Sequence, residues 1–153
     1  SGTDVYSLII TADCAAVAFY DPVREVCGNA QVGLVGAINQ LAKAMPAVMG
    51  ESFGCRARDI EAVIFPCIRA CHYNTANSMT WQKIKGRVRE EYGADNPLYA
   101  SGYFDLPGFI RGQLLEAGLR AEPIVDSGIC TVCRKDQCFS HVGAGTAAAT
   151  ERG

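Results

Sequence analysis

The sequence lacks the features that mark membrane and nucleic-acid-binding proteins. Its 153 residues carry a net charge of only −2, which gives no electrostatic reason to expect a nucleic acid or an anionic membrane as a partner. No apolar run reaches the roughly 20 residues that a membrane-spanning helix needs, and no signal peptide is visible. With 49% apolar and 20% charged residues, the chain is typical of one globular domain with its own core.

Several catalytic signatures are missing as well. No Gly-x-Ser-x-Gly segment is present, so the nucleophile elbow of a serine hydrolase is not expected. The glycines at 28 and 33 lack the spacing of a dinucleotide fingerprint, and no phosphate-loop lysine follows them. Histidine is scarce, because His72 and His141 are the only two in the chain. Any imidazole base must be one of them.

Cysteine, in contrast, is abundant for this length. We expect free thiols in a reducing, cytoplasmic compartment, because a chain of this size can build a core without disulfides. Cys130-x-x-Cys133 has the spacing of a zinc-binding pair, and Cys67-x-x-x-Cys71 could supply a second pair, giving four thiolates for a structural zinc. A disulfide and simple packing of these thiols are the alternatives. The eight cysteines are Cys14, Cys27, Cys55, Cys67, Cys71, Cys130, Cys133 and Cys138.

Cys14 lies between two apolar runs rich in β-branched residues. The pattern over 7–22 predicts a strand, a short connection at Thr11-Ala12-Asp13-Cys14 and a second strand that ends at Asp21-Pro22. A thiol fixed at a strand end can bind a metal or act as a nucleophile. The alternative is a small buried residue in a sheet.

Alternating and helical patterns along the rest of the chain predict a mixed α+β arrangement. Further strands are expected at 24–27, 60–65 and 123–126, with a strand-to-helix turn at 28–33. Three helices are expected. The first covers about 34–44, and Pro46 interrupts or ends it. The second covers about 77–92, with Asn77 or Ser78 as its cap and Gly93 as its stop, and the third covers about 106–117. We expect loops at 50–54 and 96–102 and a frayed tail from Gly143.

Four motifs, spread in order from residue 7 to residue 141, form a set. They are Thr11-Ala12-Asp13-Cys14 with Tyr20-Asp21-Pro22; Pro66-Cys67-Ile68 with Cys71 and Tyr73; Asp105-Leu106 with Arg111-x-Gln113-Leu114-Leu115-x-Ala117-Gly118; and Ser127-Gly128-x-Cys130-Thr131-x-Cys133 with Phe139-Ser140-His141. This set resembles the laccase-domain family, also called the YfiH or multicopper polyphenol oxidase family. The resemblance implies one domain over 1–153 that lacks the family's N-terminal segment.

The implied fold is an α+β mixed β-sheet sandwich with flanking helices, similar to that of the cytotoxic necrotizing factor cysteine hydrolases. The family binds zinc or copper through the cysteine of its Asp-Cys motif and two histidines. Only the cysteine carries over, as Cys14; the segment 28–33 has no histidine where the third ligand belongs, and the first histidine belongs to the upstream segment.

The resemblance also implies a small-molecule substrate. We expect action on a purine nucleoside or a similar compound, by phosphorolysis, deamination or phenol oxidation, centred on Cys14. The implied catalytic residues are Cys14, His72 and His141. The implied substrate-binding residues are Asn29, Gln31 and Arg111. Two alternatives stay open: a non-catalytic scaffold or interaction subunit that keeps the fold without the metal, and a metal-independent cysteine hydrolase. A homo- or hetero-oligomer is compatible with each.

Overall fold

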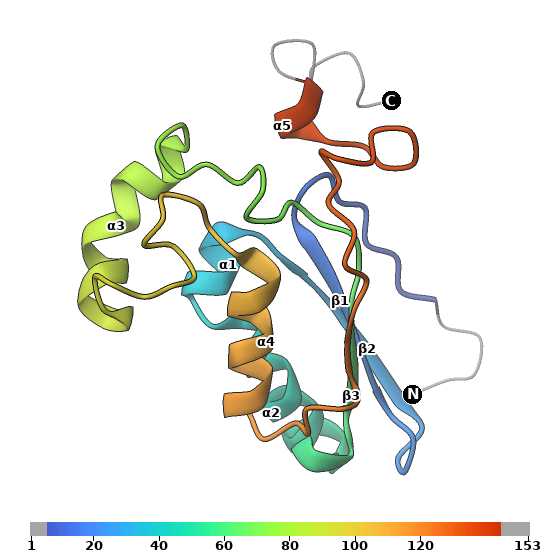
Figure 1. The fold of residues 1–153 in the computed structure, drawn as a ribbon. Helices are drawn as coiled ribbons and strands as arrows, with labels where there is room; N and C mark the ends of the chain where they lie inside the picture. The colour runs from blue at the N-terminus through green and yellow to red at the C-terminus, as the bar shows by residue number, and fades with distance from the viewer. Residues whose placement is uncertain (1–5, 145–153) are drawn as a thin grey trace.

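A computed structural model of the protein describes residues 6–144, and its centre is a four-stranded mixed sheet (Figure 1). The strand order is β2-β1-β3-β4, with β1 antiparallel to both β2 and β3 and with β3 parallel to β4. The strands span Ala15–Asp21 (β1), Val26–Val32 (β2), Glu61–Ile64 (β3) and Ile124–Asp126 (β4). The expected class, α+β with a mixed sheet and flanking helices, is confirmed.

The hairpin of β1 and β2 is closed by the carboxylate of Asp21. Its Oδ1 accepts the backbone N–H groups of Val23 and Arg24 at 2.8 and 3.0 Å, which fixes the tight turn. The predicted strand at 24–27 is too short, because pairing with β1 continues to Ala15↔Val32 and takes in most of the predicted turn at 28–33. The predicted strand at 7–10 is wrong: this segment has no strand partner.

The helix expected over 34–44 is two helices, α1 (Leu34–Ile38) and α2 (Leu41–Phe53). They separate at Gln40, whose φ of 58° is left-handed and ends the first helix. Pro46 does not end α2; it is buried inside it, so packing against the core offsets the missing hydrogen bond. The predicted loop at 50–54 is therefore wrong, and α2 ends instead at Gly54, where φ is 69°.

The later elements agree with their predictions. Ser78 caps α3 (Met79–Tyr92) by accepting the N–H of Trp81 at 3.1 Å, and Gly93 ends it. Asp105 caps α4 (Leu106–Glu116), and β3 and β4 fall inside the predicted strands. A short 3-10 helix, η1 (Ala57–Asp59), precedes β3.

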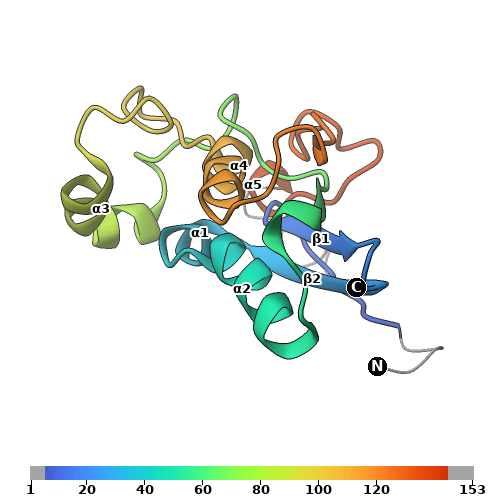
Figure 2. The same ribbon diagram turned by 90° about the horizontal axis from the view of Figure 1, so that it is seen from below.

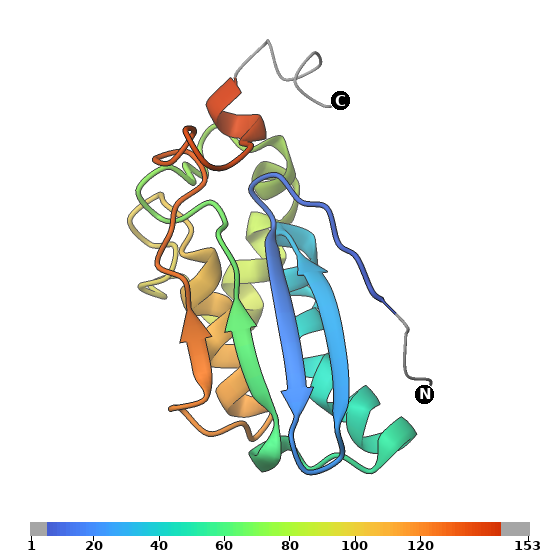
Figure 3. The ribbon, with the colours of Figure 1, turned by 90° about the vertical axis from the view of Figure 1, so that its right-hand side faces the viewer.

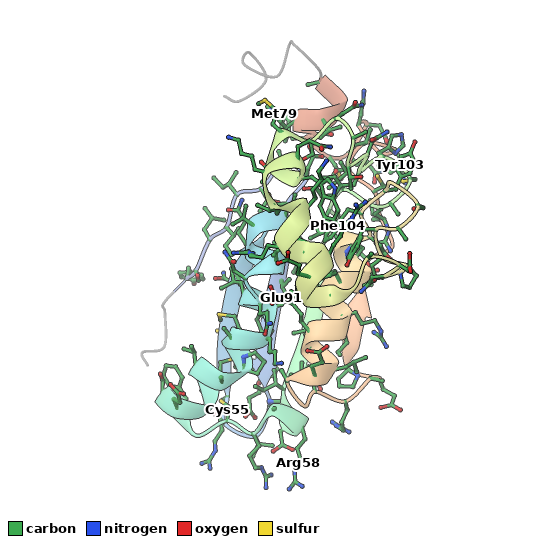
Figure 4. The ribbon with its side chains drawn as sticks, turned by 90° about the vertical axis from the view of Figure 1, so that its left-hand side faces the viewer. Cys55, Arg58, Met79, Glu91, Tyr103 and Phe104 are labelled. Atoms are coloured by element: carbon green, nitrogen blue, oxygen red, sulfur yellow. The ribbon has the colours of Figure 1, made fainter. Side chains whose placement is uncertain are left out.

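The helices cover one face of the sheet. Helices α1, α2 and α4 form the layer against it, and α3 lies outside that layer, farthest from the strands (Figures 1 and 2). Figure 4 shows α3 in front, with Met79 at its end nearer α5 and Glu91 towards its other end. An aromatic cluster joins α3 to α4, through contacts among Trp81, Tyr99, Phe104 and Phe109 with ring centroids 5.3–5.7 Å apart.

The opposite face of the sheet is not covered by any helix of residues 6–144 (Figure 3). Tyr20, Val63 and Val125 project from it and are 37–54% exposed. No helix in the described part of the chain is both long and apolar enough to cross a membrane.

One end of the sheet gathers the segments that build the site. Strand β1 begins there, while β2, β3 and β4 end there, because β1 runs antiparallel to its neighbours (Figure 3). The segments 65–76 and 127–140 and helix α5 (His141–Ala144) lie over this end (Figure 1). Cys55 lies at the opposite end (Figure 4). Most of the tail predicted to fray from Gly143 lies outside the described residues.

Candidate active site and cysteine cluster

The site is built around the buried carboxylate of Asp13. Its Oδ1 accepts the hydroxyls of Thr131 and Ser140, both at 2.7 Å, and its Oδ2 accepts the N–H of Val142 at 2.8 Å. Its backbone carbonyl accepts the N–H of Ile68 at 2.9 Å. Because a buried charge is costly without such partners, these bonds hold the start of β1 against both C-terminal segments.

The backbone of Asp13 has a φ of 77°, a left-handed conformation that a residue with a side chain seldom adopts. This conformation turns the chain just before β1 and directs the half-buried Cys14 side chain over Gly33. A Cβ atom at position 33 would lie 2.8 Å from the Cys14 Sγ atom, so only glycine leaves room for the thiol. The thiol's position is thus fixed by both neighbouring strands.

Cys14 lines a cavity of about 380 Å³. His141 from α5 and Tyr73 from the segment after β3 line the same cavity, and apolar side chains form much of the remaining wall. Burial raises the pKa of Tyr73 to about 12, and the nearby Cys14 and Asp13 add to the shift, so its hydroxyl stays protonated at neutral pH and can donate. The full lining is Ala12, Asp13, Cys14, Gly33, Ile68, Tyr73, Leu106, His141 and Val142. We call this cavity the Cys14 pocket.

Three expected substrate-binding residues lie elsewhere. Asn29 exchanges hydrogen bonds with Ser7 at 3.0 and 3.3 Å, and Gln31 is exposed. Both lie on β2 in alternation with the buried Ala30 and Val32, so they face away from the helices and do not line the Cys14 pocket. Arg111 donates to the backbone carbonyls of residues 124 and 121 at 2.8 and 3.2 Å, which ties α4 to β4.

His72, the other candidate base, lies within a separate group of sulfur ligands. The ligand atoms of Cys71, His72, Cys130 and Cys133 all lie within 4.8 Å of one another. We call these four residues the cysteine cluster. Cys67 was expected as the fourth ligand, but His72 takes that place in the cluster. The side chain of Cys67 is fully buried, and burial raises the pKa of its thiol to about 12.

Continued pairing beyond β3 and β4 brings the cluster's two segments together. The N–H of Cys67 donates to the carbonyl of Ile129 at 3.3 Å, and the N–H of Thr131 donates to the carbonyl of Cys67 at 3.2 Å. This pairing extends the parallel alignment of the two strands. Cys71 and Cys133, which are 62 positions apart in sequence, therefore meet, although no local pattern requires it.

The thiols of the cluster differ in their ease of ionisation. At Cys130, burial opposes ionisation, but the backbone N–H groups of Cys133 and Arg69 and the side chains of Cys71 and His72 lower its pKa to about 6. Burial, followed by hydrogen bonds to Cys130 and Cys133, raises the pKa of Cys71 to about 12. The cluster therefore holds a thiolate next to protonated donors. All eight cysteines lie within the described residues and are free thiols.

The Cys14 pocket does not supply a complete ligand set for zinc or copper. Catalytic zinc sites use three protein ligands, but within residues 6–144 the only close group of three or more ligands is the cysteine cluster. Both carboxylate oxygens of Asp13 already accept hydrogen bonds. We therefore derive no step through a metal at Cys14.

Asp13 and Tyr73 were not among the site residues predicted from the sequence. A carboxylate directly before a cysteine, in an otherwise apolar run, is the pattern that could have indicated a buried charge with several donors. The hydrogen-bond donors to the Asp13 side chain lie 118–129 residues away in the sequence, so no local sequence pattern could identify them.

Comparison with known proteins identifies a family and several relatives. The model of the family described as multi-copper polyphenol oxidoreductase laccase matches residues 2–150. The purine nucleoside phosphorylase YlmD of Bacillus subtilis is 31% identical over 139 residues, which cover 90% of this chain and 50% of that protein. The human purine nucleoside phosphorylase LACC1 is 28% identical over 148 residues, covering 93% of this chain and 33% of the relative.

Solved structures show the same fold. The hypothetical protein YfiH of Bacillus licheniformis superposes with a TM-score of 0.73 and 29% identity, over 87% of this chain and 50% of its own. YlmD of Geobacillus stearothermophilus gives a TM-score of 0.72 and 26% identity over the same shares. This chain thus spans about half the length of the bacterial relatives it matches.

Proposed function

Because this chain belongs to the multi-copper polyphenol oxidoreductase laccase family, we propose that it is part of an enzyme whose Cys14 pocket binds a purine nucleoside or a similar small molecule. The observation that carries the proposal is the convergence of Cys14, Tyr73 and His141, from three distant segments, on one cavity of about 380 Å³. Ligand sites are concave and mostly apolar, with a few convergent polar groups, and this cavity has that composition. Relatives named purine nucleoside phosphorylases support the substrate class.

His141 and Tyr73 each have a chemical use in nucleoside phosphorolysis. In that reaction an oxygen of phosphate bonds to C1′ of the sugar while the bond from C1′ to the base nitrogen breaks, and the base gains a proton. His141 can deliver that proton, and the protonated Tyr73 hydroxyl can hydrogen-bond the base or the sugar. The apolar side chains of Ile68 and Leu106 suit the flat base, and Cys14 lies where the bound molecule would contact β1.

The test is binding and turnover of inosine and adenosine with inorganic phosphate, followed by chromatography of the free base. We expect His141→Ala to lower kcat/KM by about 100-fold, the lower range for loss of an acid–base group. We expect Cys14→Ser to raise KM, because Cys14 would contact the bound molecule. The matched control is Cys27→Ser, since Cys27 is an exposed thiol on β2 outside the pocket. A wild-type KM in Cys14→Ser, or no nucleoside binding by the unmodified chain, would overturn the proposal.

A metal-independent cysteine hydrolase is the second candidate, favoured because Cys14 and His141 share a cavity that lacks a third available ligand. It predicts hydrolysis of ester or amide substrates that survives a chelator and stops when Cys14 is alkylated. A Cys14 that alkylates no faster than the exposed Cys27 would exclude the hydrolase.

A further inference from the structure

Four of the six separations among the ligand atoms of the cysteine cluster match those of a tetrahedral metal site, and the other two are at most 4.8 Å. The Sγ atoms of Cys71 and Cys133 are 3.8 Å apart. The Nδ1 atom of His72 is 3.3 Å from the Sγ of Cys71, 3.5 Å from that of Cys133 and 3.7 Å from that of Cys130. Tetrahedral zinc, with Zn–S bonds of about 2.3 Å and Zn–N bonds of about 2.0 Å, separates two sulfurs by roughly 3.8 Å and a sulfur and a nitrogen by roughly 3.5 Å.

We propose that the cysteine cluster binds a structural Zn²⁺ ion through three thiolates and the Nδ1 atom of His72. Thiolates select soft or borderline ions, and a tetrahedral set of three sulfurs and one nitrogen fills every position that zinc takes in a structural site. The set leaves no open position for a substrate. This zinc is therefore distinct from any metal at Cys14, and the proposal does not depend on the nucleoside activity.

The surroundings of the cluster suit a metal–thiolate centre. Three thiolates and one Zn²⁺ carry a net negative charge, and the cationic residues Arg69 and Arg134 line the same surface depression, each also paired with a carboxylate, that of Asp126 and Asp136 respectively. Cys71, His72 and Cys133 are exposed, so an ion can enter from solvent.

The zinc would join the two segments that build the Cys14 pocket. Cys71 and His72 directly precede Tyr73, which lines that pocket. Cys130 directly precedes Thr131, whose hydroxyl donates to the Asp13 carboxylate at 2.7 Å. An ion bound between these segments would hold both in register without contacting the substrate. Its role is therefore structural positioning rather than catalysis.

The first measurement is the zinc content of the full chain, purified under reducing conditions and passed over a weak chelating resin. We expect about one zinc ion per chain in the wild type and at least a tenfold loss in Cys133→Ser and His72→Ala. The matched control is Cys138→Ser, a half-buried thiol of the same segment outside the cluster, which should keep its zinc. Cys67→Ala should also keep it, which separates this set from one of four thiolates.

Cobalt substitution gives a readout that needs no variant to fold. Titration of the metal-free wild type with Co²⁺ should produce the intense visible bands of tetrahedral cobalt together with sulfur-to-metal charge transfer. Octahedral cobalt spectra, zinc retained by Cys133→Ser, copper in place of zinc, or a Cys71–Cys133 disulfide in protein kept under reducing conditions would each overturn the proposal. Circular dichroism of each variant shows whether lost zinc reflects a lost ligand or a lost fold.

Discussion

The Cys14 pocket and the cysteine cluster occupy the same end of the sheet, draw on the same segments and use the same residue types, yet their chemistry differs. The pocket brings one thiol and one imidazole to an apolar cavity, whereas the cluster brings three thiols and one imidazole to the surface. A single thiol with a nearby base is suited to contact with a substrate. Four convergent soft donors are suited to a closed metal site. The number of donors that meet therefore separates two functions built from the same side chains.

The two regions also differ in what holds them. The pocket is fixed by the buried carboxylate of Asp13 and its three side-chain acceptor bonds. The cluster has no such buried hub: three of its four members are exposed, and its segments meet through backbone pairing and the partly exposed ion pair of Arg69 and Asp126. Removing Asp13 should therefore damage the pocket, and removing the metal should loosen the cluster first.

The largest effect should follow Asp13→Ala. This change leaves the hydroxyls of Thr131 and Ser140 and the N–H of Val142 without their acceptor, and each unmet buried donor costs about 1–3 kcal/mol. We expect the free energy of unfolding to fall by about 3 kcal/mol or more, measured by urea denaturation. Asp136→Ala, which removes an exposed carboxylate paired with Arg134, is the control. A loss no larger than the control's would show that Asp13 does not hold the pocket.

A smaller effect should follow removal of zinc from the cluster. Treating the wild type with a strong chelator should lower Tm by about 5 °C, the shift that a loss of roughly 2 kcal/mol produces in a domain of this size. Added Zn²⁺ should restore it. In the same samples the exposed Cys71 and Cys133 should alkylate only after metal removal, while labelling of Cys14 should change little. Equal protection of Cys14 by zinc would mean that the two regions are not separate.

Structural features were predicted correctly from the sequence where the residues that determine them lie close together in the chain. Helix α3 was predicted with its cap at Asn77 or Ser78 and its end at Gly93, and the structure has Ser78 and Gly93, because each signal acts within a few residues. The strand expected at 7–10 and the single helix over 34–44 were wrong. In both cases the apolar pattern alone did not determine the structure. The segment 7–10 has no strand beside it to pair with, and the helix is divided because the chain turns at Gln40, whose backbone is left-handed.

The site followed the same rule. Cys14 was placed at the start of a strand by local pattern, but the choice between His72 and His141 could not be made from sequence. That choice depends on bonds from Asp13 to Ser140 and Val142, across more than 120 residues. The exchange of Cys67 for His72 in the cluster has a similar origin. Residue 67 continues β3's pairing and is buried, while residues 71 and 72 lie in the following turn.

A finer test of the pocket is Gly33→Ala. The added Cβ atom would lie 2.8 Å from the Cys14 sulfur, so the thiol must move. We expect slower alkylation of Cys14 and weaker nucleoside binding, with a stability loss of about 1 kcal/mol. Gly112→Ala on α4 is the matched control, because nothing lies within 4 Å of its added Cβ and alanine favours a helix. Unchanged Cys14 reactivity in Gly33→Ala would show that glycine is not required there.

The smallest effect concerns the ion pair of Arg69 and Asp126, which joins the cluster's two segments. Both terminal guanidinium nitrogens of Arg69 donate to the carboxylate, at 2.8 and 2.7 Å, and these hydrogen bonds hold the pKa of Asp126 below its ordinary value. Because the folded state binds this proton less readily than the unfolded state, the pair stabilises the fold above the ordinary pKa of an aspartate. That stabilisation is lost as pH falls through the lowered pKa.

The pair is about one-quarter exposed, which limits its contribution to about 1 kcal/mol. Asp126→Asn should therefore lower the urea midpoint slightly at pH 7, and the difference from the wild type should shrink as the pH falls through the lowered pKa of Asp126 and its carboxylate becomes protonated. A difference between the two proteins that stays constant over this range would show that the pairing of these segments does not depend on the charge of Asp126. The cluster's alignment would then rest on backbone pairing and the bound metal alone.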